Sequence, residues 1–345
     1  MNIELLESLS NQFGPSGFES SVTGIIKGNV SQLSRDLKID ALGNLIMRIG
    51  DEGPRVLLSA HVDEVGVIIT HVDQRGFIRV ASLGGIDPWV MIGQELVFRT
   101  RRGELIRGVV GIDPPHLRRE KPPNRFEELY VDAGFTSREE ASKAGVVPGI
   151  PGTFSTVMVH SGDVIMGKAL DDRLGAYALI EVARRIRSSN ATFFFAWNTQ
   201  EEVGLRGIQA VINGINPELA IVVETTVAAD VPSNPEEQWI TRLGGGAAIR
   251  AMDRSMITNP TLLEKATAIL ESKGVKYQLQ VNPYGGTDAG AIHVHGTGVP
   301  TLVVSTPARY IHAPRSIALM SDVDAVISSL SLLLENINYL VSPLY

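Results

Sequence analysis

Four short, almost uninterrupted runs of apolar residues constrain the fold of this chain most strongly. The runs occupy residues 56–58, 193–197, 219–223 and 301–304. They are mostly β-branched or aromatic, and they alternate with segments of helical periodicity. Solid runs of this length are typical of strands buried on both faces, as in a parallel or mixed sheet covered by helices. We therefore predict an α/β fold with a mixed, largely parallel sheet sandwiched by helices.

The helical periodicity is clearest in three segments of the chain. They cover residues 173–189, 261–273 and roughly 322–339. Apolar residues recur in them with the spacing of one helix face. These segments are the helices expected to cover the sheet.

Residues 66–163 have a different texture, with alternating apolar and polar residues and closely spaced turns that contain glycine. The alternation is clearest in residues 66–70, 76–81, 95–100 and 105–111. Short strands joined by close turns are typical of a small β-barrel. The sequence therefore predicts a discontinuous catalytic domain, residues 1–65 and 164–345, interrupted by a barrel domain of residues 66–163.

Charge and composition exclude several classes of protein. The chain of 345 residues has 31 Lys plus Arg against 38 Asp plus Glu, a net charge of −7, which argues against nucleic-acid and anionic-membrane partners. It has no cysteine, so disulfides, thiol nucleophiles and cysteine metal sites are excluded. A membrane span needs about 18–20 apolar residues, which no run approaches. The acidic N-terminal segment does not resemble a secretory signal, so we expect a cytoplasmic protein.

Residues that can bind metal follow the apolar runs. They are His61, Asp63, Glu201, Glu202, Glu224 and, in a later loop, His312. Ligands of open α/β sheets bind beyond the carboxyl ends of the strands, where such side chains meet. Each member also has an ordinary structural explanation, such as a polar strand end or a solvated loop. The combination at one sheet edge is what indicates a site.

Two local patterns strengthen this interpretation. Asp63 stands two residues after His61, so on an extended chain it can accept a hydrogen bond from the imidazole ring and orient it, as partners of metal-binding histidines do. Asp171 and Asp172 are adjacent, and a helix N-cap explains only one of them. Two adjacent carboxylates repel each other unless a cation or Arg173 compensates, and an Asp171 that bridges metal ions fits better.

Together these residues predict two metal sites that share one aspartate. The predicted ligands are His61, Asp171, Glu202, Glu224 and His312. Paired metal sites of this kind occur in aminopeptidases and phosphatases. A ligand set of nitrogen and oxygen suits zinc, cobalt or manganese. Either Glu201 or Glu202 could face substrate water as a general base.

Five motifs, in this order, resemble the TET-type (tetrahedral) dinuclear metallo-aminopeptidases, which are also named glutamyl or deblocking aminopeptidases or endoglucanases. The motifs cover residues 59–66, 167–173, 199–204, 286–289 and 311–315. The resemblance extends over nearly the whole chain, the inserted segment included. It implies a hydrolase that removes N-terminal residues from peptides with a free N-terminus.

The resemblance also implies a role for each site residue. Glu201 would be the general base for a water activated by two divalent ions, zinc or cobalt first and manganese third, and Asp63 would orient His61. The Asp171–Asp172 peptide bond would be cis. Glu224 departs from the family, in which aspartate is frequent at this position. The inserted barrel would build dimers that assemble into a dodecamer.

Two alternatives remain open at this point. A glycoside hydrolase needs two carboxyl groups facing each other about 5–9.5 Å apart, which neighbours such as Glu201 and Glu202 do not provide. A non-catalytic, metal-binding assembly subunit would leave Glu201 without a task.

Overall fold

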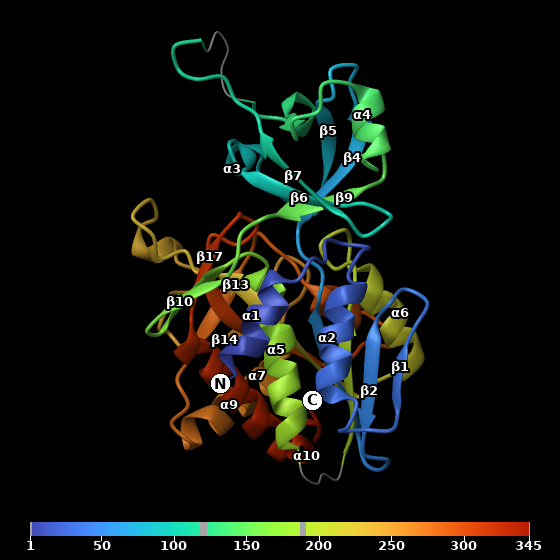
Figure 1. Cartoon of the computed structure of the whole chain (residues 1–345). Helices are drawn as coiled ribbons and strands as arrows, with labels where there is room; N and C mark the ends of the chain where they lie inside the picture. Colours follow the sequence, from blue (N-terminus) through green and yellow to red (C-terminus); the bar gives the residue numbers. More distant parts are fainter. Residues whose placement is uncertain (1, 118–122, 187–190, 345) are drawn as a thin grey trace.

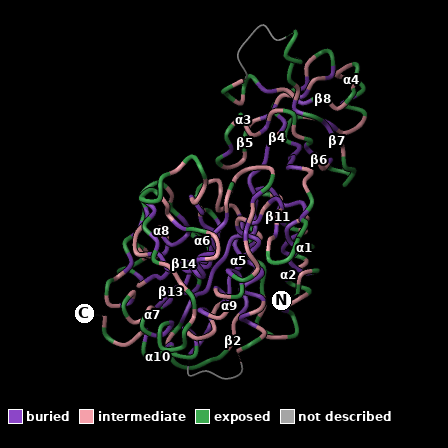
Figure 2. Tube along the Cα trace, turned by 90° about the vertical axis from the view of Figure 1, so that its left-hand side faces the viewer, coloured by how far each residue is buried: buried purple, intermediate pink, exposed green. Residues whose placement is uncertain are grey.

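The computed structural model describes residues 2–117, 123–186 and 191–344. Its two parts are a large α/β unit and a smaller β-barrel, which stands above the larger unit in Figure 1. Both have a buried apolar interior, drawn in purple in Figure 2. The predicted combination of a helix-covered sheet and a β-barrel is confirmed.

The centre of the large sheet is parallel. Its neighbouring strands, in spatial order, are β12 (Thr192–Asn198), β3 (Arg55–His61), β13 (Leu219–Val227) and β16 (Thr301–Arg309). All three pairings within this set are parallel. These strands contain the four solid apolar runs, so burial on both faces explains their composition.

Antiparallel strands extend the sheet on both sides. On the β12 side lie β2 (Leu45–Ile49) and β1 (Leu37–Ile39), and on the β16 side lie β17 (Ser316–Leu319), β11 (Val164–Gly167) and β10 (Val159–Ser161). β14 (Ala247–Asp253) pairs with β16 and carries β15 (Tyr277–Asn282). The predicted mixed sheet is confirmed: its four central strands are parallel, β14 and β15 also pair in parallel, and the other pairings are antiparallel.

Helices cover both faces of this sheet. One core cluster contains the apolar residues of α1 (Ile3–Asn11), α2 (Ser20–Val30), α5 (Leu170–Arg185), α7 (Pro260–Ser272) and α9 (Met320–Glu335). Another contains those of α6 (Arg206–Ile215) and α8 (Asp288–His293). The short α10 (Ile337–Leu340) follows α9.

The predicted helices agree with α5, α7 and the pair α9 and α10, with small differences at their ends. α9 and α10 are separated at Asn336. The predicted end of the first helix, residues 187–189, lies outside the described residues. Within the described ranges, no helix has the length and apolar character needed to cross a membrane.

The barrel is closed by six antiparallel strands. They are β4 (Gly66–Val72), β5 (Ile78–Leu83), β6 (Glu95–Arg99), β7 (Leu105–Val110), β8 (Val131–Asp132) and β9 (Pro151–Phe154). The short helices α3 (Pro88–Met91) and α4 (Arg138–Lys143) connect them. The inward-facing apolar side chains form a core separate from that of the large unit, as the alternating pattern predicts.

Candidate metal centre

The predicted site residues meet at the carboxyl edge of the parallel strands. His61 is the last residue of β3, and Glu201 and Glu202 follow β12. The prediction that the next strand stops at Glu224 is wrong, because β13 continues to Val227. The β-branched residues Thr225, Thr226 and Val227 continue the pairing with β16, so Glu224 projects from within a strand.

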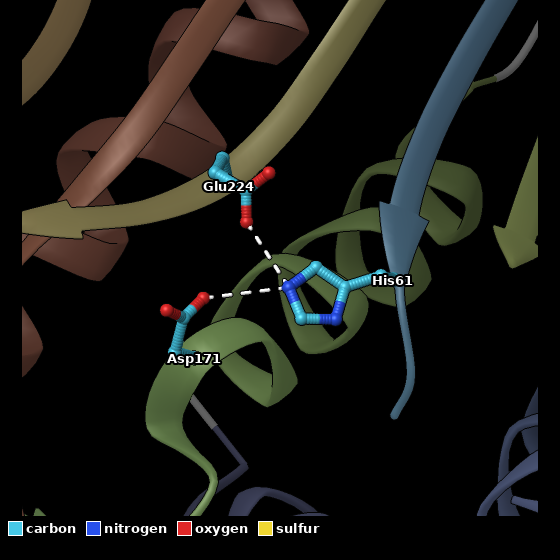
Figure 3. A group of neighbouring side chains, drawn as sticks. All are labelled: His61, Asp171 and Glu224. Atoms are coloured by element: carbon cyan, nitrogen blue, oxygen red, sulfur yellow. Dashed lines mark ion pairs between the residues drawn. The ribbon is translucent and has the colours of Figure 1, made fainter. Parts of the chain in front are cut away.

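His61, Asp171 and Glu224 form the first of two groups, the His61 group. His61 Nε2 lies 3.4 Å from Asp171 Oδ1 and 3.3 Å from Glu224 Oε1. Figure 3 shows both carboxylates turned toward this ring nitrogen. His61 and Glu224 are buried, so these polar atoms face one another away from bulk water.

Asp171, Glu202 and His312 form the second group, the His312 group. His312 Nε2 lies 3.4 Å from Asp171 Oδ2 and 3.1 Å from Glu202 Oε1. Asp171 therefore offers one oxygen to each histidine, and it stands between the two groups. In the part of the chain that the structure describes, these are the two groups whose donor atoms lie close enough together to hold a metal ion.

The spacing of the donor atoms suits metal coordination. Zinc bonds to nitrogen and oxygen are about 2.0–2.2 Å long, so donors around a tetrahedral ion lie roughly 3.3 Å apart. The four histidine–carboxylate distances are 3.4, 3.3, 3.4 and 3.1 Å, close to this spacing, and the first three are longer than the usual hydrogen-bond range. Glu202 Oε1 is buried without an aligned hydrogen-bond partner in the structure. The residues present therefore fit a pair of divalent cations.

The adjacent aspartates have different surroundings. The Asp171–Asp172 peptide bond is cis, as the resemblance implied. Asp171 faces the histidines, whereas Asp172 Oδ1 accepts hydrogen bonds from the Gly175 N–H (3.1 Å) and the Thr225 hydroxyl (3.0 Å). Burial, together with the nearby Glu224, raises the pKa of Asp172 well above its usual range. Asp172 is thus the capping residue of the pair.

Asp63 lies behind His61. Its Oδ1 is 3.3 Å from His61 Nδ1, and it accepts hydrogen bonds from the Ser16 hydroxyl (2.6 Å) and the backbone N–H groups of Glu201 (3.0 Å) and Glu202 (3.2 Å). Burial favours a neutral carboxyl here, but His61, Ser16 and Glu201 outweigh it and lower the pKa of Asp63. A charged Asp63 can hold the His61 ring in place.

Glu201 faces the same cavity as both groups. This cavity has a volume of about 1090 Å³, and its lining also includes Arg254 and Tyr284. Burial raises the pKa of Glu201 well above its usual range; His61 opposes that rise, and Asp288 and Glu224 add to it. A carboxyl group with a raised pKa holds a proton more strongly than usual. Beside a large cavity, such a group is suited to accept a proton and return it.

Asp288 is a further buried acidic residue that affects Glu201, and it is not among the site residues predicted from the sequence. Its side chain accepts a hydrogen bond from the Asn198 amide at the end of β12. Burial, reinforced by Glu224, raises the pKa of Asp288 to about 8. Thr287 caps α8, and its side chain accepts a hydrogen bond from the Ala289 N–H. The signal available in the sequence is the motif of residues 286–289, one of the five that carry the resemblance, but the motif alone does not show that Asp288 is buried.

Comparisons with known proteins agree with the resemblance. Residues 43–328 match the family described as M42 glutamyl aminopeptidase. The lysyl aminopeptidase of Pyrococcus furiosus is 33% identical to this chain over 341 residues, which cover 97% of each protein.

Two solved structures extend this similarity to the fold. A TET aminopeptidase from a marine-sediment Thaumarchaeota archaeon is 33% identical, with a TM-score of 0.95 over 99% of this chain and 98% of that one. The TET1 peptidase of Pyrococcus horikoshii, which can assemble into a tetrahedron or a large octahedral shell, is 31% identical, with a TM-score of 0.87 over 96% and 98%. This chain belongs to the M42 glutamyl aminopeptidase family of peptide hydrolases.

Proposed function

We propose that this chain is a dinuclear metallo-aminopeptidase that removes N-terminal residues from peptides. The observation that carries the proposal is the position of Asp171, whose two oxygens face the Nε2 atoms of His61 and His312 at 3.4 Å each. Glu224 and Glu202 complete the two groups. The all-nitrogen-and-oxygen donor set suits zinc, cobalt or manganese, of which zinc or cobalt is the ion that we propose first.

In this proposal the chain's own groups position the substrate and move the proton. Two bound cations would polarise the scissile carbonyl and lower the pKa of a water molecule. Glu201 would accept a proton from the attacking water and return it to the leaving amine. The free α-amine of the substrate would lie against a carboxylate or a cation of the site. This requirement for a free amine would restrict cleavage to chain ends. Asp63 would keep His61 in its binding orientation.

The geometry does not favour a glycoside hydrolase. Such an enzyme needs two carboxyl groups facing each other across a sugar. Here Glu202 and Glu224 each point to a histidine nitrogen instead. A purely structural metal site would not require Glu201 to face a cavity of about 1090 Å³.

The test is an assay on aminoacyl-p-nitroanilides before chelation, after chelation, and after zinc, cobalt or manganese is added back, with metal content measured in parallel. We expect two ions per chain, loss of activity on chelation and its return with metal. Hydrolysis that survives full metal removal would contradict the proposal. Activity on carboxymethylcellulose alone would favour the glycosidase, and no activity at two ions per chain would favour the assembly subunit.

We also propose that the barrel joins copies of this chain into a dodecamer built from dimers. The barrel exposes large apolar side chains, with 63% of Trp89, 55% of Leu105 and 47% of Val109 accessible. Exposed apolar side chains of this size are available for packing against a second copy. Closed assemblies are built from repeated interfaces, so loss of one interface type disperses the whole. Light scattering should give a dodecameric mass, and a much smaller mass when residues 67–154 are replaced by a Gly/Ser linker.

A further inference from the structure

We infer that the barrel is part of the metal centre: the backbone carbonyl of Gly85 positions His312, so that cation binding by the His312 group depends on the barrel. Gly85 lies between β5 and α3 of the barrel, and its oxygen is 2.8 Å from His312 Nδ1. This inference rests on the proposed metal sites. It adds a positioning residue that contributes no side chain.

The hydrogen bond determines which ring nitrogen of His312 is available. A carbonyl oxygen can only accept, so Nδ1 carries the proton and donates it to Gly85. In the neutral ring the lone pair is then on the other nitrogen, Nε2, which faces Asp171 and Glu202. A histidine that binds metal through one nitrogen is commonly held by such a bond at the other.

The neighbouring Gly84 brings the barrel against the second ligand of this group. A Cβ atom at position 84 would lie 3.1 Å from Glu202 Cβ and 2.9 Å from Val65 Cγ1. The φ angle of Gly84 is +84°, which residues with a side chain rarely adopt. Only glycine fits this approach. The Gly84–Gly85 segment therefore contacts both Glu202 and His312.

The His61 group is supported differently. Behind His61 stands Asp63, which is held by Ser16 and by backbone N–H groups that follow β12. All of these residues belong to the large unit.

The barrel also contacts the segment next to Asp63, but that contact is one of several. The Thr153 hydroxyl of β9 donates to Glu64 at 2.8 Å. Glu64 is held as well by Lys168 Nζ at 2.7 Å and by the Gly14 N–H at 3.0 Å, both from the large unit. Movement of the barrel should therefore weaken the His312 group more than the His61 group.

The test compares Gly84→Ala with Gly103→Ala. Gly103 lies in the same barrel with a φ of +85°, and a Cβ there would meet nothing within 4 Å, so the control carries the same backbone strain without contact to the site. Zn²⁺ and Co²⁺ affinities are measured by competition with a chromophoric chelator, and circular dichroism and light scattering check the fold. We expect Gly84→Ala to bind one of its two cations about 10–100-fold more weakly. Gly103→Ala should bind both as the wild type does.

A backbone variant gives an independent measurement. An ester in place of the Gly85–Ile86 amide weakens the Gly85 carbonyl as an acceptor and adds no side chain. It should reduce the affinity for the same cation, and it decides the question if Gly84→Ala does not fold. Unchanged affinity for both cations, or equal weakening of both, would overturn the inference. A wild-type protein that binds fewer than two cations would instead refute the proposed function.

Discussion

Asp63 accepts a hydrogen bond of 3.0 Å from the backbone N–H of Glu201. The residue that stands behind His61 therefore also holds the segment that carries the proposed base. Orientation of a ligand and orientation of the base are joined through one buried carboxylate.

Asp63→Asn should disturb both the orientation of His61 and the orientation of the segment that carries Glu201. The carboxylate faces backbone N–H donors on both oxygens, since Glu201 N–H points to Oδ1 and Glu202 N–H points to Oδ2, which also accepts from the Ser16 hydroxyl. Either orientation of an asparagine amide sets its NH₂ against one of these donors. We expect metal affinity and kcat each to fall about 10–100-fold. Ser16→Ala, which removes one donor only, is the control and should lose much less.

Glu201→Gln should abolish turnover without loss of metal. The proposed base moves a proton and holds no cation, so we expect kcat to fall by about 10²–10⁴-fold or more. Steady-state kinetics and elemental analysis on the same sample check this. Retained activity would remove Glu201 from the mechanism, and lost metal would exchange the roles of Glu201 and Glu202.

Glu202→Ala and His312→Ala should each make activity depend on added metal. Both side chains belong to the His312 group, and loss of either leaves too few donors for one ion. Dialysis against a chelator, followed by elemental analysis and assay, measures the effect. If a variant keeps two ions and full activity after dialysis, the residue that was replaced is not a metal ligand.

Glu224→Asp should have a milder effect than either alanine variant. The shorter side chain withdraws its carboxylate from His61 Nε2, now 3.3 Å from Glu224 Oε1, but remains a possible ligand. We expect a changed order of preference among zinc, cobalt and manganese. The measurement is kcat/KM with each metal in turn, and an unchanged order would show that side-chain length at this position is not tuned.

Glu19→Gln should stabilise the protein above neutral pH. Burial, and then the nearby Asp63, raise the pKa of Glu19 from 4.5 to about 7. The folded protein keeps this proton up to about pH 7 and the unfolded chain releases it near 4.5, so the wild type loses stability as pH rises through this window.

Glutamine retains an acceptor oxygen for the N–H groups of Gly17 and Gln200 but does not titrate. We expect the free energy of unfolding of the variant, relative to the wild type, to rise by up to about 3 kcal/mol between pH 4.5 and 7. Urea denaturation of the metal-free protein across this range gives the difference, with Glu7→Gln on the exposed side of α1 as the control. A difference that does not change with pH would contradict the assigned burial effect.

The sequence was sufficient to predict the central strands and the barrel because both have strong local patterns. Solid β-branched runs have few other stable locations than a doubly covered sheet, and regular alternation indicates a one-sided core. The pairing of β14 with β16 was not predicted, because it is a long-range choice without a local signature. The extension of β13 past Glu224 was missed because a buried charge was interpreted as a strand end.

The candidate site also contains residues that the sequence could predict and residues that it could not. Side chains such as His61 and Glu202 can be found from the positions of the strand ends. The inward position of Asp288 depends on its contact with Asn198, which only the packed fold creates. A backbone carbonyl such as that of Gly85 has no side chain to mark it, so residue types alone give no sign that the barrel contacts His312.

The bond between His312 and Gly85 has a thermodynamic counterpart. Coupling between two binding events is reciprocal, so a barrel that strengthens cation binding must itself be held more firmly once the cation is bound. In the proposed assembly, scarcity of metal would then loosen the part of each chain that joins it to its neighbours. The particle would disperse as its catalytic ions are lost, and metal supply would set the amount of closed shell as well as the rate of hydrolysis.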